Sequence, residues 1–437
     1  MLRQSTQVTG RPGTDDQSPP LQFSGKLVDL ANFENTIFAH ANSRQMGLGI
    51  THGPGSNGEL LSMDLEVSKL EKLKLDRVTY EIIGDATSKI SFKASESNES
   101  DSINHLVIDK EIDTFLNVIE PYVDIKGKFK NLTRKKLIKF YSEQTYPRSA
   151  FSPYPIFNVD RNHMESMEEI AKRNWNVFFK SDELSNEEAM ALLFTSSQWY
   201  SRIQERYFST SRSLRSVAHI GPLRNVFGRF QELRFGETRY VGQAGENTLE
   251  ILYRSGVAES STQNLVNDWF KRLGLSYEIR VDSISGDSQH FVGDLASLVI
   301  HDVNSKIDLS ARDVGVGISQ VIPVIVQSLI AKESTLLIEQ PELHLHPKLQ
   351  SEIGDLLIHS FLENRNQLIV ETHSEHLLLR LMRRIREGDL PNEALKVVYV
   401  DSGENGSAAT LIDFDVDGQL TQPWPNGFFE ERLEELF

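Results

Sequence analysis

The stretch STLLIEQPELHLHPKLQSEIGDLLIHSFLENRNQLIVETHS occupies residues 334–374 and decides the fold of the chain. Residues 335–338 form a short apolar run, which is typical of a central parallel strand buried on both faces. Pro347 opens a helical pattern, because a proline in the first helical position loses no hydrogen bond. Residues 368–370 form a second apolar run. The order strand, helix, strand predicts an α/β fold with a parallel sheet.

Polar side chains follow both strands at the point where the chain leaves the sheet. Glu339, Gln340 and Glu342 follow the first strand, and His373 follows the second. Open α/β sheets bind ligands at the carboxyl ends of their strands. A carboxylate there can hold Mg²⁺, a neighbouring side chain can orient a water molecule, and a histidine can reach a γ-phosphate. The edge therefore predicts phosphoryl chemistry.

A glycine-containing stretch lies upstream, RDVGVGISQ at residues 312–320, and it opens an apolar helix. Gly315, Gly317, Ser319 and Gln320 would place backbone N–H groups, a hydroxyl and the helix dipole at one anion site. Pro323 is expected near the start of this helix, where a missing N–H is tolerated.

Residues 312–320, 335–347 and 370–375, in this order, resemble ABC-class AAA ATPases of the RecF/SMC/overcoming-lysogenization-defect kind. The resemblance implies that Gly315, Gly317, Ser319 and Gln320 are the signature, which touches ATP bound on a partner subunit. It also implies a Walker B strand at 336–339 and a switch histidine at His373. The implied cofactors are ATP and Mg²⁺, with Glu339 at the metal and a catalytic set of Glu339, Gln340, Glu342 and His373.

More narrowly, the chain resembles a bacterial group of such ATPases that carry a C-terminal domain of unknown function. Runs such as HIGPLR at 219–224 and WPNGFF at 424–429 carry this resemblance, which covers the chain from the Lys26 region onward. It implies an ABC-ATPase-like head with a mixed or parallel core sheet and flanking helices, an antiparallel β subdomain and a helical insertion. It also implies a homodimer that drives DNA maintenance or anti-phage defence beside a separately encoded nuclease or toxin.

The first departure from the resembled pattern is the lack of a Walker A motif. The glycines of GPGSNG at 53–58 have the right spacing, but Glu59 and Leu60 stand where GxxxxGK[ST] requires lysine and serine or threonine. A carboxylate would repel phosphate there, so this segment is interpreted as a turn between strands. Relatives place the residues resembling 1–5 just after the phosphate-loop helix. We therefore expect a chain that starts late, through a short reading frame or a lost N-terminal strand and loop.

The second departure is Gln340, which stands where most ABC-class ATPases have a glutamate as general base. Glutamine cannot take a proton, although it can position a water molecule. Two alternatives stay open: Glu342 takes part in the chemistry, or hydrolysis is slow and ATP acts mainly as a clamp.

Composition bounds the function of the 437-residue chain. Its formal net charge of −16 argues against a generally basic nucleic-acid-binding protein. It has no cysteine, which excludes disulfides and thiolate metal sites. No apolar run approaches the roughly 20 residues of a membrane span, and the N-terminus lacks the apolar core of a signal peptide. We expect a cytoplasmic protein that does not enter membranes.

The sequence pattern, together with what the resemblance implies, divides the chain into five parts. Residues 1–20 are expected to be disordered or truncated, 21–110 an antiparallel β part with strands near 26–30, 46–51, 60–67, 78–83 and 89–93, and 111–217 a mostly helical insertion. Residues 218–415 would form the ATPase C-lobe and 416–437 a C-terminal tail. The insertion carries the densest basic run, a candidate DNA contact or a solvated helix face, at Lys128, Lys130, Arg134, Lys135 and Lys136.

Two other functions compete with the ATPase. One is a pseudo-ATPase scaffold that keeps the dimer surface without its own phosphate loop. The other is a metal-dependent hydrolase, because H-x-H and H-x-x-H spacings recur in metal sites. Its candidate ligands are Glu342, His344, His346, His373 and His376.

Overall fold

A computed structural model describes the backbone of residues 45–52, 60–69, 73–83, 88–93, 104–105 and 145–146. It also describes residues 214–233, 239–256, 261–284, 295–403 and 406–425. The chain divides into two compact units, Met1–Arg215 and Ser216–Phe437.

The N-terminal unit contains a six-stranded sheet whose strands follow one another in chain order, and every neighbouring pair is antiparallel. The expectation of an antiparallel subdomain is confirmed. The strand expected near 26–30 and the basic run lie outside the described residues, and so does most of the expected helical insertion. The strands are β1 (Gln45–His52), β2 (Leu60–Lys69), β3 (Leu73–Ile83), β4 (Ser88–Lys93), β5 (Asn104–His105) and β6 (Thr145–Tyr146).

Residues 53–59, which include the GPGSNG segment, connect β1 to β2. A phosphate loop joins a strand to a helix, but this segment is followed by β2, which runs antiparallel to β1. The strand that begins at Leu60 thus disagrees with a phosphate loop at 53–58.

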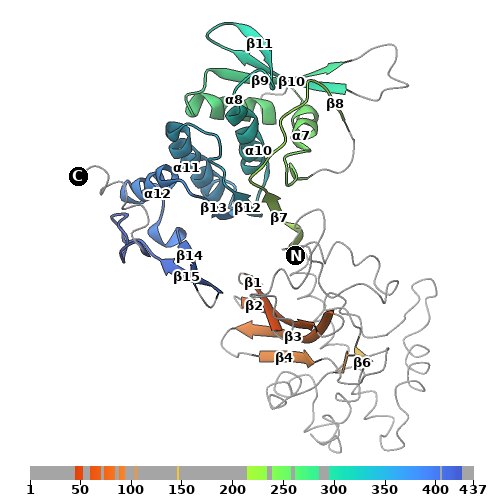
Figure 1. Ribbon diagram of the computed structural model, residues 1–437, viewed down its shortest axis with the longest axis vertical. Helices are drawn as coiled ribbons and strands as arrows, with labels where there is room; N and C mark the ends of the chain where they lie inside the picture. The colour runs from red at the N-terminus through yellow and green to blue at the C-terminus, as the bar shows by residue number, and fades with distance from the viewer. Residues whose placement is uncertain are drawn as a thin grey trace, which may run out of the picture. The chain divides into compact units, whose positions relative to one another are not determined.

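The C-terminal unit is built around a parallel sheet in the order β13-β12-β7 (Figure 1). These strands are β7 (Val217–Ile220), β12 (Thr335–Glu339) and β13 (Gln367–Glu371). Helix α11 (Pro347–Leu362) connects β12 to β13, and α12 (Glu375–Arg386) follows β13. The strand–helix–strand order expected from 334–374 is confirmed.

The other elements of this unit lie before and after that sheet. An antiparallel sheet combines β8 (Gln231–Glu232), β9 (Tyr277–Ile284), β10 (Leu295–Asp302) and β11 (Ile307–Ser310). Helices α7 (Thr248–Arg254), α8 (Thr262–Arg272) and α10 (Val316–Ile330) belong to the same part of the chain. The chain then continues through η3 (Asn392–Ala394) and the hairpin of β14 (Val397–Gly403) and β15 (Gly406–Ile412).

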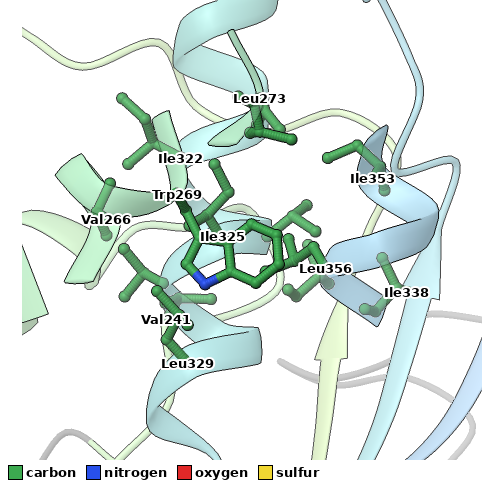
Figure 2. Close-up of a cluster of buried hydrophobic side chains, with 14 of the residues drawn as sticks. Val241, Val266, Trp269, Leu273, Ile322, Ile325, Leu329, Ile338, Ile353 and Leu356 are labelled. Atoms are coloured by element: carbon green, nitrogen blue, oxygen red, sulfur yellow. The ribbon is translucent and has the colours of Figure 1, made fainter. Parts of the chain in front are cut away.

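Helix α10 forms the centre of the core. All its residues from 318 to 329 are buried, although valine and isoleucine are only moderate helix formers, so burial and not propensity stabilises the helix. Ile322, Ile325 and Leu329 belong to a buried cluster that also contains Trp269 of α8 and Ile353 of α11 (Figure 2). Helix α11 lies between α10 and α12 (Figure 1).

Pro323 does not lie in the first turn of α10, as expected, but inside the helix. The helix begins at Val316, so the proline is about two turns in. The facing residue is Gly245, where a Cβ atom would come within 2.7 Å of the Pro323 ring. The missing side chain leaves room for the ring, and the surrounding core keeps the helix intact.

Candidate functional site at the carboxyl edge of the parallel sheet

The polar residues predicted at the edge do come from neighbouring strands. Glu339 ends β12, Glu371 ends β13, and the two residues are paired in register. The backbone N–H of Gln340 donates to the carbonyl of Glu371 at 2.8 Å. This bond ties the turn after β12 to the end of β13.

Glu339 has a partner that the sequence did not suggest. Its Oε1 lies 2.7 Å from Nε2 of His219, on β7. His219 pairs in register with Leu337, and Glu339 lies two residues further along β12 on the same face. The Glu339 side chain is 36 % exposed, whereas that of His219 is 10 % exposed, so the carboxylate faces open space while one oxygen is fixed.

Arg224 is buried, at 4 % exposure, and forms a clamp between two elements. Its Nη2 donates to the backbone carbonyls of Glu339, at 2.6 Å, and Gln340, at 3.2 Å, and its Nη1 donates to the carbonyl of Gln320 at 3.3 Å. Burial lowers the pKa of the guanidinium to about 10, and the charges of Glu342 and Glu339 oppose that shift. The group therefore stays charged at neutral pH.

Gln340 adopts a left-handed backbone conformation, with φ of 43°. A residue other than glycine is rarely found there, and such strain persists only where neighbouring bonds hold it. His344, in the same turn, is also left-handed, with φ of 63°. Neither position was expected from the sequence, because neither residue is glycine, the residue that adopts this conformation without steric cost.

Glu342 is buried and bonds to the second turn. Its Oε1 accepts from the backbone N–H of His373 at 2.8 Å, while its Oε2 has no hydrogen-bond partner among the described residues. His373 itself is exposed. The arrangement gives Glu342 a place behind the turn and leaves the His373 imidazole at the surface.

The glycine-containing stretch meets the same edge. A Cβ atom on Gly317 would come within 2.6 Å of the carbonyl oxygen of His344, so glycine allows the start of α10 to lie directly against the turn after β12. Gly315, the N-cap residue, is exposed, and a Cβ atom there would meet nothing within 4 Å. The start of α10 therefore combines one close contact with one open position.

Ser319 and Gln320 point inward. The Ser319 hydroxyl is buried and donates to the carbonyl of Ala311 at 3.0 Å. The Gln320 amide exchanges two bonds with the backbone of Arg224: its Oε1 accepts from the N–H at 3.0 Å, and its Nε2 donates to the carbonyl at 2.6 Å. Of the four predicted signature residues, the glycines lie at the open helix start and the two polar side chains lie in the core.

The described residues do not assemble a multi-ligand metal site. No group of three or more histidine or acidic side chains in that part of the chain could hold a metal ion. All five candidate ligands of the hydrolase alternative are described, and they do not come together in such a group. Mg²⁺ remains compatible with Glu339, because it is usually held by one or two carboxylates, substrate phosphates and water.

No helix in the described part of the chain is long and apolar enough to cross a membrane.

Comparisons with known proteins address the family. Residues 56–378, more than half of the chain, match the family of AAA ATPase domains. The search of curated proteins finds no match.

Solved structures give only slight likenesses. The Smc head domain with an extended coiled coil bound to the C-terminal domain of ScpA, from Pyrococcus furiosus, is 12 % identical with a TM-score of 0.34, covering 93 % of this chain and 84 % of that chain. The Smc head domain with a coiled coil and joint from Pyrococcus yayanosii is 12 % identical with a TM-score of 0.29, covering 88 % and 87 %. The assignment rests on the match over 56–378, which agrees with the ATPase family expected from the motifs. The chain belongs to the AAA ATPase domain family.

Proposed function

We propose that the chain binds ATP with Mg²⁺ at the carboxyl edge of β12 and β13, and that two copies form the complete site. The observation that carries the proposal is the meeting of three features at one place. A partly exposed carboxylate ends β12, and an exposed histidine follows β13. The start of α10 is open at Gly315 and packs at Gly317 against the turn after β12. Helix starts attract phosphate, so Gly315 and Gly317 would contact nucleotide held by the partner copy.

Each edge residue then has a role that fits its surroundings. Glu339 would hold Mg²⁺ directly or through water, since only one of its oxygens is bonded to His219. Gln340 would orient the attacking water without taking its proton, as a glutamine does in small GTPases. His373 would reach the γ-phosphate.

Glu342 fits a positioning role better than that of a general base. Its carboxylate is buried and bonded to a backbone N–H, so it does not face the open edge. With glutamine at position 340 and Glu342 turned inward, we expect slow hydrolysis, with bound ATP acting mainly as a clamp between subunits.

The wider proposal follows the resemblance. Residues 21–110 would be the β part of the N-lobe, 111–217 a helical insertion, 218–415 the C-lobe and 416–437 a docking tail. The dimer would drive a DNA-maintenance or anti-phage partner, such as a nuclease or toxin subunit. DNA would be contacted through Lys128, Lys130, Arg134, Lys135 and Lys136, which lie outside the described residues.

One observation favours a second candidate, a pseudo-ATPase scaffold. The sequence contains no GxxxxGK[ST], and the segment with the nearest glycine spacing leads into strand β2. A chain of this kind would keep the dimer surface around α10 without binding nucleotide tightly.

Titration with a fluorescent ATP analogue, with Mg²⁺ and with EDTA, separates the two candidates. The ATPase proposal predicts saturable, Mg²⁺-dependent binding that weakens about tenfold or more in Glu339→Gln. Glu393→Gln, an exposed carboxylate on η3, is the matched control and should bind like the wild type. Equal, negligible binding in all three proteins favours the scaffold and counts against the ATPase.

A further inference from the structure

We propose that Arg224 is a positioning residue that couples the start of α10 to the backbone of Gln340. It would transmit nucleotide contact at the helix start to the residue that orients the attacking water. This inference rests on the proposed function and gives that site a mechanical link.

The link to α10 consists of three hydrogen bonds with one residue. The backbone N–H and C=O of Arg224 hold the Gln320 side chain, and the Arg224 guanidinium holds the Gln320 carbonyl. Gln320 lies in the first turns of α10, three residues after Gly317. The backbone of each residue is thus bonded to the side chain of the other. A shift of the helix start would therefore move Arg224.

The link to the sheet edge ends at the strained residue. The same guanidinium donates to the carbonyls of Glu339 and Gln340, while the N–H of Gln340 is held by Glu371. These bonds fix the peptide groups on both sides of the Gln340 Cα atom. They set the direction in which its side chain leaves the left-handed backbone.

The chemistry of the site calls for arginine. The planar guanidinium serves three carbonyls on two elements at once, which a lysine ammonium on a flexible stem cannot reproduce. Among the described residues, the guanidinium bonds only to backbone carbonyls and to no carboxylate, and its Nε has no acceptor. The fields of Glu342 and Glu339 partly offset the cost of its burial.

Arg224 lies in the loop that connects β7 to β8, residues 221–230. The first part of this loop is fixed independently of the guanidinium. Gly221 and Asn225 donate their N–H groups to the carbonyls of Gln243 and Ala244, each at 2.8 Å. Arg224→Lys should therefore keep the path of the loop while removing the fork. Arg229, which is exposed in the same loop, provides the matched control Arg229→Lys.

The first arm of the test is hydrogen exchange on the nucleotide-free chain. We expect amides of 339–345 and of 316–320 to exchange about tenfold faster or more in Arg224→Lys. Amides of 353–360 and the whole Arg229→Lys chain should match the wild type. Unchanged exchange at 339–345, or faster exchange everywhere, overturns the proposal. If Arg224→Lys fails to fold, Gln320→Leu replaces it as the test variant. It removes the two bonds between the Gln320 side chain and the Arg224 backbone, and it must speed amide exchange at 339–345.

The second arm measures turnover and distinguishes positioning from simple support. Arg224→Lys should lower kcat about tenfold or more while the Kd for Mg²⁺ATP stays within about threefold. Adding Gln340→Ala should lower kcat further in the wild type but not in Arg224→Lys. Equal losses from Gln340→Ala in both backgrounds overturn the coupling. If the wild type neither binds nor hydrolyses ATP, the proposed function fails, and exchange alone decides whether Arg224 holds Gln340.

Discussion

The turn after β12 and the turn after β13 stand side by side at one sheet edge, yet their backbones are held in different ways. The first turn contains two left-handed residues, Gln340 and His344. It is held by residues distant in sequence: Arg224 clamps its carbonyls, and Gly317 of α10 packs against it. Strain supported from outside is typical of positions where geometry must be fixed before a ligand arrives.

The second turn is short and is held through Ser374 and the backbone of His373. Ser374 caps α12 by accepting the N–H of Leu377 at 3.1 Å, and its hydroxyl donates to Gln350. The bond from outside that bears on the proposed site is the one from Glu342 to the N–H of His373. The acidic turn is thus held by Arg224 and Gly317 from other elements, whereas the position of the histidine depends on a carboxylate that belongs to the first turn.

Hydrolysis should respond very differently to changes at the two carboxylates that end the strands. Glu339→Gln should lower Mg²⁺-dependent hydrolysis roughly 100-fold or more, because a ligand of the metal is lost. Glu371→Gln should stay close to the wild type, since the described contact of Glu371 with the first turn is through its backbone carbonyl. Phosphate release at saturating ATP measures both. Equal losses would erase the proposed difference between the strand ends.

The next effect tests the bond between the turns. Glu342→Ala should lower the free energy of unfolding by about 3 kcal/mol, because it frees the His373 N–H and removes a charge that offsets the burial of Arg224. Glu342→Gln keeps an acceptor and should lose less. Denaturant unfolding gives the free energies. Identical values for the two variants would show that the bond to His373 contributes nothing.

A pair of glycine substitutions tests how the first turn is supported. Gly317→Ala brings a methyl group against the His344 carbonyl and should cost about 1–3 kcal/mol. Gly315→Ala meets no atom within 4 Å and should change stability by less than about 0.5 kcal/mol. Thermal unfolding compares the two. A larger loss at Gly315 would contradict the close packing of α10 on the turn.

The smallest effect comes from a site that belongs to neither turn. Burial, followed by the charge of Arg272, lowers the pKa of His359. The centroid of its ring lies 5.3 Å from that of Trp269. Because the unfolded chain then binds more protons than the folded chain, acid favours unfolding. The stabilisation that the packed, neutral His359 ring provides is therefore fully present above pH 6.5 and declines as the pH falls. The stability gap between wild type and His359→Gln should narrow from pH 8 to pH 5.5. A gap that widens in acid would reverse the sign.

The sequence predicted those features of the site that depend on local pattern. The strands around 335–338 and 368–370, the proline-led helix and the shared carboxyl edge follow from apolar runs and their boundaries. Three features were not predicted: the His219 contact, the Arg224 clamp and the inward Glu342. They join residues from distant parts of the chain, and such contacts leave no periodic pattern in the sequence. Pro323 was misplaced for a related reason, because its tolerance depends on Gly245 across the core.

In the proposed dimer each nucleotide site is shared by two copies, and mixing two defective chains tests this sharing. Glu339→Gln removes the proposed metal carboxylate, and Gly315→Glu places a negative charge at the helix start, where an added Cβ atom would meet nothing within 4 Å. A mixed dimer keeps one intact site made from the edge of one copy and the helix start of the other. Each variant alone should be nearly inactive, and the mixture should regain about a quarter of wild-type phosphate release. A mixture as inactive as its components would contradict it.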